Sequence, residues 1–127
     1  MDIIDMHVHT NASDGILSPR EAVQWAVRLG LRGIAITDHD TVGGIKEGLQ
    51  TAQKYKDFLF IPGIEFSTFY KDIEVHVLGY FINYQNEKLL AISERIRNAR
   101  LERTTKMIEK LNQLGIDIHA SEVFSAF

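Results

Sequence analysis

The 127-residue sequence contains no cysteine. Disulfide bonds, thiolate metal ligands and a cysteine nucleophile are therefore excluded, and any metal ligand must be a His, Asp or Glu side chain. The sequence also lacks an uninterrupted apolar run near the roughly 18 residues that a membrane span needs. Its N-terminus lacks the charged-then-apolar layout of a signal peptide. We therefore expect a cytoplasmic protein that does not interact with a membrane.

An excess of basic residues is missing as well. The 14 Lys and Arg residues are outnumbered by 17 Asp and Glu residues, and the formal net charge is -3. This balance gives no general attraction for a polyanion, so we expect no stable binding of duplex DNA and only local recognition of phosphate. With 45% hydrophobic and 24% charged residues, the composition is that of a soluble globular protein.

Short runs of branched apolar residues alternate with amphipathic stretches. The expected strands cover residues 2–8, 33–37, 58–64 and 73–82, and the expected helices cover residues 19–30, 41–56 and 86–115. Ser18, Pro19 and Glu21 supply the N-cap, first-turn proline and capping-box glutamate of the first helix. Three strands that alternate with helices, each followed by polar residues, predict a parallel α/β fold with its active site at the strand ends.

The stretch from residue 86 to residue 115 is long for one helix. Its apolar spacing is loose between residues 97 and 106, so we expect a break or a projecting helix there. Three or four strands leave a parallel sheet unfinished, so we expect residues 1–127 to be the N-terminal part of a larger domain. The expected division is residues 1–83 for the barrel strands and metal ligands, 84–115 for the long helix or helical insertion, and 116–127 for the start of a following helix.

His7 and His9 stand two residues apart at the end of the first predicted strand. Their side chains therefore leave the same side of the strand and can converge on one ion, although such a pair is equally compatible with ordinary packing. Further candidate ligands follow along the chain. They are Asp14, His39, Glu65 and His76. Because a parallel sheet gathers its strand ends at one rim, the set predicts a shared metal site.

Imidazoles and carboxylates without thiolates suit manganese, iron or zinc better than magnesium alone. A carboxylate such as Glu65 can bridge two ions, and paired cations orient a phosphate ester, activate a water and neutralise developing charge. We therefore expect paired divalent ions, with manganese, iron and zinc all compatible with these ligands, and hydrolysis of a phosphate ester.

Five segments together resemble the first motifs of the PHP (polymerase and histidinol phosphatase) superfamily. They are Asp5-Met6-His7-Val8-His9, Ser13-Asp14-Gly15, Thr37-Asp38-His39-Asp40, Gly63-Ile64-Glu65 and Val75-His76. The resemblance implies a distorted seven-stranded TIM-like (β/α) barrel with a trinuclear site. With the resemblance added, we expect two or three divalent ions, with manganese ahead of zinc and iron. The implied ligands are His7, His9 and Glu65 for one metal, Glu65 and His76 for a second with Glu65 bridging, and Asp14 with His39 for a third. Asp14, His39 and Glu65 are accordingly expected to act in catalysis.

The segment Ser13-Asp14-Gly15 is more similar to stand-alone PHP enzymes that act on nucleotides than to histidinol phosphatases, which often carry a histidine in place of Asp14. The resemblance implies removal of phosphate from nucleoside 3',5'-bisphosphates or stepwise hydrolysis of short RNA from its 5' end. A non-catalytic or proofreading module of a DNA polymerase, a histidinol-phosphatase-like enzyme and a metal-stabilised domain without turnover remain alternatives.

Later family ligands, a histidine and an Asp-x-His pair, have no counterpart in these 127 residues, and His119 does not match them. By the resemblance, the piece alone holds an incomplete site that is weakly active or inactive. Arg100 and Arg103 could grip a second phosphate of a substrate, but a solvated helix face is the stronger interpretation.

Asp5, Asp38 and Asp40 are expected to orient the histidines through hydrogen bonds, and binding of metal or relay of a proton by one of them is the less favoured alternative. Capping of the following helix is the alternative for Asp38 and Asp40. A second group, Phe66, Phe69 and Tyr70, follows Glu65 in the sequence and could stack on a base, although core packing is favoured.

Overall fold

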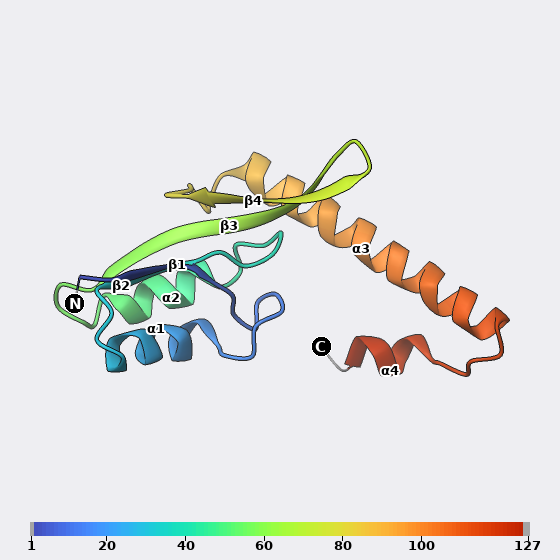
Figure 1. The fold of residues 1–127 in the computed structure, drawn as a ribbon, viewed down its shortest axis with the longest axis horizontal. Helices are drawn as coiled ribbons and strands as arrows, with labels where there is room; N and C mark the ends of the chain where they lie inside the picture. The colour runs from blue at the N-terminus through green and yellow to red at the C-terminus, as the bar shows by residue number, and fades with distance from the viewer. Residues whose placement is uncertain (1, 126–127) are drawn as a thin grey trace. The chain divides into compact units, whose positions relative to one another are not determined.

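The computed structural model describes residues 2–125, which form two compact units, one ending at Ser93 and the other beginning at Glu94. The first unit contains β1 (Ile4–Val8), α1 (Pro19–Arg28), β2 (Gly33–Ile36), α2 (Ile45–Ala52), β3 (Leu59–Tyr70) and β4 (Ile73–Tyr80) (Figure 1). The helix α3 (Glu87–Gln113) begins in the first unit and continues into the second, which also contains α4 (Ala120–Ser125). No helix within residues 2–125 is both long enough and apolar enough to cross a membrane.

The first unit is built on one sheet with the strand order β1-β2-β3-β4. The first three strands are parallel because a helix connects each strand to the next, whereas β4 returns antiparallel to β3 through a short turn. The helices α1 and α2 lie on one face of the sheet (Figure 1). The predicted α/β class and the parallel arrangement of the first three strands are confirmed.

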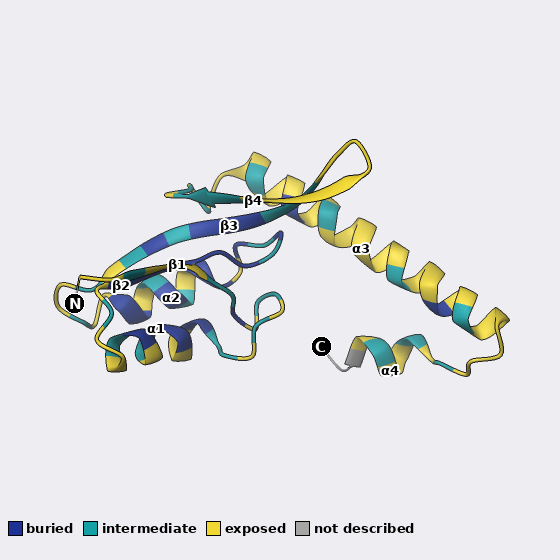
Figure 2. Ribbon diagram, viewed as in Figure 1, coloured by how far each residue is buried: buried dark blue, intermediate teal, exposed yellow. Residues whose placement is uncertain are grey.

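The core lies between this helical layer and the sheet. Val23 of α1 and Ile45 of α2 pack in one cluster with Ile36 of β2. Gly48 lets α2 approach closely, because a Cβ atom there would lie 2.6 Å from Phe60 Cε2 and 2.8 Å from Ile36 Cδ1. The buried residues follow α1, α2 and the first half of β3, and the tip of the β3–β4 hairpin is exposed (Figure 2). Close packing therefore fixes the strands that carry the candidate ligands.

The first helix begins as the sequence predicts. Ser18 is the N-cap, its hydroxyl accepts a hydrogen bond from the Glu21 backbone, and the Glu21 carboxylate accepts one from the Ser18 backbone at 2.8 Å. Pro19 occupies the first helical position, where its missing N–H group costs no helical hydrogen bond. The cap fixes where the loop after β1 ends and α1 begins.

The third strand differs from the prediction, which ended it at Ile64. It continues to Tyr70, because β4 pairs with it from Gly63 and Tyr80 out to Tyr70 and Ile73. Glu65 therefore lies inside a strand and not at its end. The fourth predicted strand, with His76 inside it, is confirmed.

Two predicted helices also differ from the structure. Residues 41–44 precede α2, with a turn at residues 43–44, and the N-cap of the helix is Gly44. Of the two alternatives for residues 97–106, a break or a projecting helix, the break does not occur, since α3 is continuous there. Local interactions support its polar middle, including an ion pair between Lys106 Nζ and Glu102 Oε1 at 2.7 Å. The helix expected in residues 116–127 is present as α4, and residues 126–127 lie outside the described part of the chain.

Candidate metal centre

The structure brings all six predicted ligands together in the first unit. His7 lies in β1 and His9 directly after it, while Asp14 lies in the loop that leads to α1. The other three are His39 in the segment after β2, Glu65 in β3 and His76 in β4. Their donor atoms form three overlapping groups of three residues. Within each group, the donor atoms lie within 4.8 Å of one another.

Glu65 is the centre of this cluster. Its Oε2 atom lies 2.9 Å from His7 Nε2, 2.8 Å from His9 Nε2 and 3.6 Å from His39 Nε2. Its other oxygen, Oε1, lies 3.1 Å from His76 Nδ1. The residue is only 4% exposed. One buried carboxylate thus faces four imidazoles and presents its two oxygens to different ring nitrogens, which is the arrangement of a bridging ligand.

The backbone explains why His39 reaches Glu65 although β2 has already ended. The Glu65 N–H group donates to the Asp38 carbonyl at 3.1 Å, and the Asp40 N–H group donates to the Glu65 carbonyl at 2.9 Å. These two bonds form an isolated parallel bridge between His39 and Glu65. Strand β4 pairs with the other edge of β3 at this level, where Leu78 is opposite Glu65. The Glu65 backbone is therefore held on both sides.

The donor geometry fits a divalent ion. His7 Nε2 and His9 Nε2 are 2.9 Å apart, and both lie at 2.8–2.9 Å from the same Glu65 oxygen. An ion with ligands at about 2.1 Å separates neighbouring donors at right angles by about 3 Å. This triangle of two nitrogens and one oxygen therefore fits one ion with little rearrangement.

Asp14 extends the cluster toward solvent. Its Oδ1 atom lies 2.7 Å from His9 Nδ1, and its Oδ2 atom lies 3.8 Å from His39 Nε2. The side chain is 63% exposed, whereas that of Glu65 is 5% exposed. His9 uses both ring nitrogens, one toward Glu65 and one toward Asp14, and so joins two of the three groups.

The electrostatics favour anionic carboxylates. Burial acts to raise the pKa of Glu65, but the hydrogen bond from His7 and the charges of His39 and His9 outweigh it and hold the pKa below its ordinary value. Burial likewise opposes ionisation of Asp14, and contacts with His9 and neighbouring groups lower its pKa nevertheless. Carboxylates bind metal in the deprotonated form, so both are suited to act as ligands near neutral pH.

The three aspartates expected to support the histidines have different surroundings. Asp5 Oδ1 accepts a hydrogen bond from the His7 backbone at 3.1 Å. Asp40 Oδ1 accepts one from the Ser67 backbone at 2.9 Å. Asp38 is 1% exposed and accepts hydrogen bonds from the loop after β1. The capping alternative for Asp38 and Asp40 is wrong, because α2 begins at Gly44 without a side-chain cap.

The aromatic residues after Glu65 divide into two kinds. Phe66 is half-buried and packs against the core, as favoured from the sequence. Phe69 and Tyr70 are 65% and 67% exposed, so core packing is wrong for both within the described structure. Arg100 and Arg103 lie on exposed turns of α3 in the second unit, and their role in substrate binding stays a prediction.

Sequence reasoning missed two contributors to the site. Glu74 Oε1 lies 3.5 Å from His76 Nε2, and the spacing of these residues repeats the two-residue spacing of His7 and His9. Ser13 donates to Asp38, and its presence in a recognised motif was the only sign of a role.

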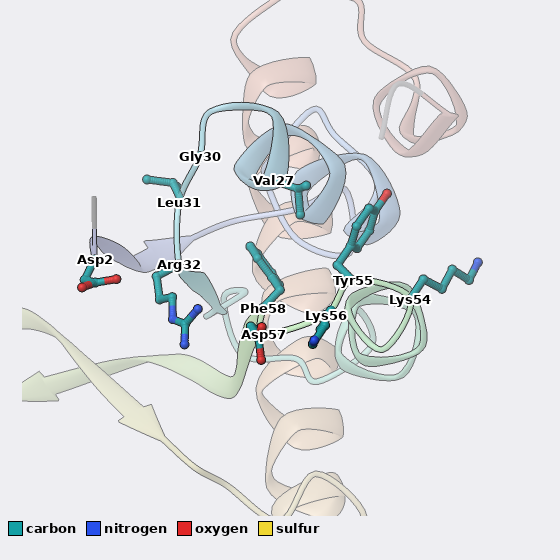
Figure 3. Close-up of a pocket in the computed structure, with 10 residues that line it drawn as sticks. All are labelled: Asp2, Val27, Gly30, Leu31, Arg32, Lys54, Tyr55, Lys56, Asp57 and Phe58. Carbon is teal, nitrogen blue, oxygen red and sulfur yellow. The ribbon is translucent and has the colours of Figure 1, made fainter.

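A hollow of about 440 Å³ lies at the opposite end of the sheet. Its lining includes Asp2, Arg32 and Phe58, which precede β1, β2 and β3 (Figure 3). None of the six clustered residues lines it. The candidate metal centre and this hollow are therefore separate features.

A partly parallel α/β sheet that brings four imidazoles and two carboxylates together defines an α/β protein with a candidate multinuclear metal site. Residues 5–117 match the PHP domain. The chain belongs to the PHP family.

Two relatives and one solved structure are similar over most of the chain. The 5'-3' exoribonuclease of Haemophilus influenzae is 35% identical over 112 residues, which are 88% of this chain and 40% of the relative. The 3',5'-nucleoside bisphosphate phosphatase of Chromobacterium violaceum is 35% identical over 113 residues, or 89% of this chain and 39% of the relative. A protein of Bifidobacterium adolescentis described as a metal-dependent phosphoesterase superimposes with a TM-score of 0.87 at 35% identity, covering 98% of this chain and 43% of that one. The chain thus spans about 40% of the length of these proteins.

Proposed function

We propose that this protein hydrolyses phosphate esters of nucleotides with two or three divalent ions bound at the candidate metal centre. The observation that carries the proposal is Glu65, a buried carboxylate whose two oxygens face different imidazoles. The relatives named as a nucleoside bisphosphate phosphatase and an exoribonuclease support the nucleotide as substrate. Because the chain belongs to the PHP family, we also propose that it forms part of a seven-stranded TIM-like barrel.

The proposed ligands follow the three groups in the structure. His7 and His9 would hold one ion with Glu65, and Glu65 and His76 would hold a second. Asp14 and His39 would hold a third, beside His9, whose Nδ1 atom lies 2.7 Å from Asp14 Oδ1. Imidazole and carboxylate ligands suit manganese, with zinc or iron as alternatives. When bound, such ions polarise the phosphate and lower the pKa of a coordinated water.

The ligands differ in exposure. Glu65 is enclosed, whereas the side chains of Asp14, His7 and His76 are 63%, 47% and 41% exposed, so solvent reaches the cluster along several ligands. Asp14 Oδ2 and His39 Nε2 lie 3.8 Å apart. As ligands of the third ion, these two residues would act in catalysis by holding the ion that activates the attacking water.

The direct test is phosphate release by the protein expressed from its complete gene. Nucleoside 3',5'-bisphosphate, 5'-phosphorylated short RNA and histidinol phosphate are each supplied with Mn²⁺, Zn²⁺ or Fe²⁺. We expect release from one of the nucleotide substrates, stimulated by Mn²⁺, and its loss in His7→Ala. Turnover of histidinol phosphate alone would refute the nucleotide proposal, and no turnover with any ion would refute the hydrolase proposal.

A matched control is available for the histidine variant. His119 lies outside the cluster and its side chain is 68% exposed. His119→Ala should keep both activity and metal content, so an equal loss in His119→Ala and His7→Ala would show that the effect does not arise at the candidate metal centre.

A further inference from the structure

Asp38 is a buried carboxylate that contacts the loop after β1. Its Oδ1 atom accepts hydrogen bonds from the Thr10 backbone at 2.6 Å and from the Ser13 hydroxyl at 2.7 Å. Its Oδ2 atom accepts one from the Thr10 hydroxyl at 2.7 Å. Asp38 and Thr10 are 1% and 0% exposed. Three hydrogen bonds to one charged acceptor thus join the segment after β2 to the loop after β1.

The loop is in turn closed on Thr10. The Thr10 carbonyl accepts hydrogen bonds from the backbone of Ser13 at 3.0 Å and of Gly15 at 2.9 Å. Asp14 lies between these two anchored residues. Gly15 also has to be a glycine, because a Cβ atom there would lie 2.4 Å from the His9 carbonyl oxygen. Fixing Thr10 and Ser13 therefore fixes the backbone from which the Asp14 carboxylate extends.

The surroundings leave the Asp38 carboxylate little freedom. A Cβ atom at Gly44 would lie 2.7 Å from Asp38 Oδ2 and 3.0 Å from Thr10 Oγ1. The start of α2 therefore packs directly against the paired side chains. A buried carboxylate is costly unless hydrogen bonds satisfy it, so the three donors and the acceptor stabilise one arrangement of the loop.

We propose that Asp38 is a positioning residue that holds the Thr10–Gly15 loop so that Asp14 meets His9 and His39. It acts through hydrogen bonds to Thr10 and Ser13, and Asp14 carries the effect to the ion. The inference rests on the proposed function in taking the cluster as a metal site.

The test is a double-mutant cycle on metal affinity, measured by calorimetric titration of Mn²⁺ into the metal-free protein expressed from its complete gene, without substrate. Asp38→Ala should weaken the ion bound by Asp14 by about 10–100-fold, as loss of a supporting hydrogen-bond partner does at metal sites. In an Asp14→Ala background the same change should have no further effect, because the ligand that Asp38 positions is already absent. An additive loss would overturn the proposal.

A conservative variant separates positioning from charge. In Asp38→Asn the amide oxygen can still accept from the Thr10 backbone and the Ser13 hydroxyl, and the amide nitrogen can donate to Thr10 Oγ1. Asp38→Asn should therefore restore affinity to within a few-fold of the parent. If Asp38→Asn and Asp38→Ala lower the affinity for the ion equally, the charge of Asp38 matters and its hydrogen bonds do not. The proposal then fails. Asp72→Ala, at an exposed aspartate in the β3–β4 turn, is the control and should change nothing.

A second variant and a second measurement keep the test decisive if Asp38→Ala does not fold. Ser13→Ala removes a partly exposed hydroxyl that lies 2.7 Å from Asp38 Oδ1 and 3.2 Å from Asp14 Oδ1, and it should weaken binding of the same ion several-fold. Hydrogen exchange of the amides at positions 13 and 15, measured without metal, should be faster in Ser13→Ala and Asp38→Asn than in the parent. If Asp38→Ala folds, its exchange should be faster still. Unchanged exchange and unchanged affinity in Ser13→Ala would overturn the proposal. Intact ion binding without phosphate release would refute the proposed function alone.

Discussion

Glu65 and His76 lie on neighbouring antiparallel strands, and Glu65 Oε1 is 3.1 Å from His76 Nδ1. This contact leaves Glu65 Oε2 for His7 and His9. Each oxygen of Glu65 therefore belongs to a different donor group. A change at Glu65 should affect both groups at once, whereas a change at His76 should affect one.

The first prediction concerns this difference. Glu65→Gln should lower kcat/KM by more than about 100-fold, equivalent to about 2.7 kcal/mol of transition-state stabilisation, because a neutral amide cannot bridge two cations. It should also remove more bound metal than His76→Ala, measured by elemental analysis of the purified variants. Equal metal content in the two variants would contradict a bridging role for Glu65.

The second prediction concerns the N-cap of α1. Hydrogen bonds from the Ser18 hydroxyl and backbone lower the pKa of Glu21 below its ordinary value of 4.5. A group whose pKa is lowered by folding stabilises the protein above its unfolded-state pKa and loses that effect as the pH falls through the lowered value. Chemical denaturation should therefore show Glu21→Gln to be less stable than the parent at neutral pH, with a difference that shrinks below about pH 4.5.

The pH effect has an internal control in Ser18. Ser18→Ala removes the hydroxyl donor but keeps the backbone donor, and loss of this cap should cost about 1 kcal/mol. In the Ser18→Ala background, the pH-dependent difference caused by Glu21→Gln should be smaller. An unchanged difference would mean that the hydroxyl does not contribute.

The third prediction tests how closely α2 packs on the sheet. Gly48→Ala places a methyl group where a Cβ atom would be 2.6 Å from Phe60 Cε2 and 2.8 Å from Ile36 Cδ1. Although alanine favours a helix, this overpacking should destabilise the protein by about 1–3 kcal/mol in chemical denaturation. Gln50→Ala, at an exposed position of α2, should stay within about 0.5 kcal/mol of the parent. A stabilised Gly48→Ala would show that Phe60 can move aside.

The fourth prediction concerns the exposed Phe69. Phe69 follows Glu65 by four residues in β3, so its side chain leaves the same face of the strand, whereas Tyr70 leaves the opposite face. If Phe69 stacks on the base of a nucleotide, Phe69→Ala should raise KM about 5-fold, equivalent to about 1 kcal/mol. Tyr70→Ala is the matched control, since it is equally exposed and should leave KM unchanged.

A substrate without a base makes the stacking test sharper. Ribose 3,5-bisphosphate should show the same KM with the parent and with Phe69→Ala, because it offers no aromatic ring to stack on. If Phe69→Ala raises the KM of the nucleotide and of the base-free substrate equally, Phe69 affects the shape of the hairpin and does not stack on the base.

Local sequence was sufficient for some elements and insufficient for others. Ser18, Pro19 and Glu21 predict the start of α1, because a capping box depends on residues only three positions apart. The extent of β3 could not be predicted in this way. The end of β3 depends on its pairing with β4, which runs from Gly63 and Tyr80 to Tyr70 and Ile73. The sequence reveals such a strand end only if the partner strand is known.

The candidate site shows the same division. Clustering of His7, His9, Asp14 and His39 could be predicted because parallel strands gather their ends at one rim. Glu65 and His76 join them from inside the antiparallel pair of β3 and β4, which that rule does not describe. The role of Asp38 could not, because it stands beside His39 in the sequence but accepts hydrogen bonds from Thr10 and Ser13, 28 and 25 residues away. Position next to a ligand does not reveal which direction a side chain takes after the strand has ended.

The two-sided support of the Glu65 backbone has a consequence for protein engineering. Between Glu65 and the turn at Lys71 and Asp72, the hairpin continues as a pair of strands that are exposed at the tip. Loop tips of this kind tolerate insertion. New recognition sequences grafted between Tyr70 and Ile73 could therefore alter substrate preference while the ligand-bearing part of β3 stays in place.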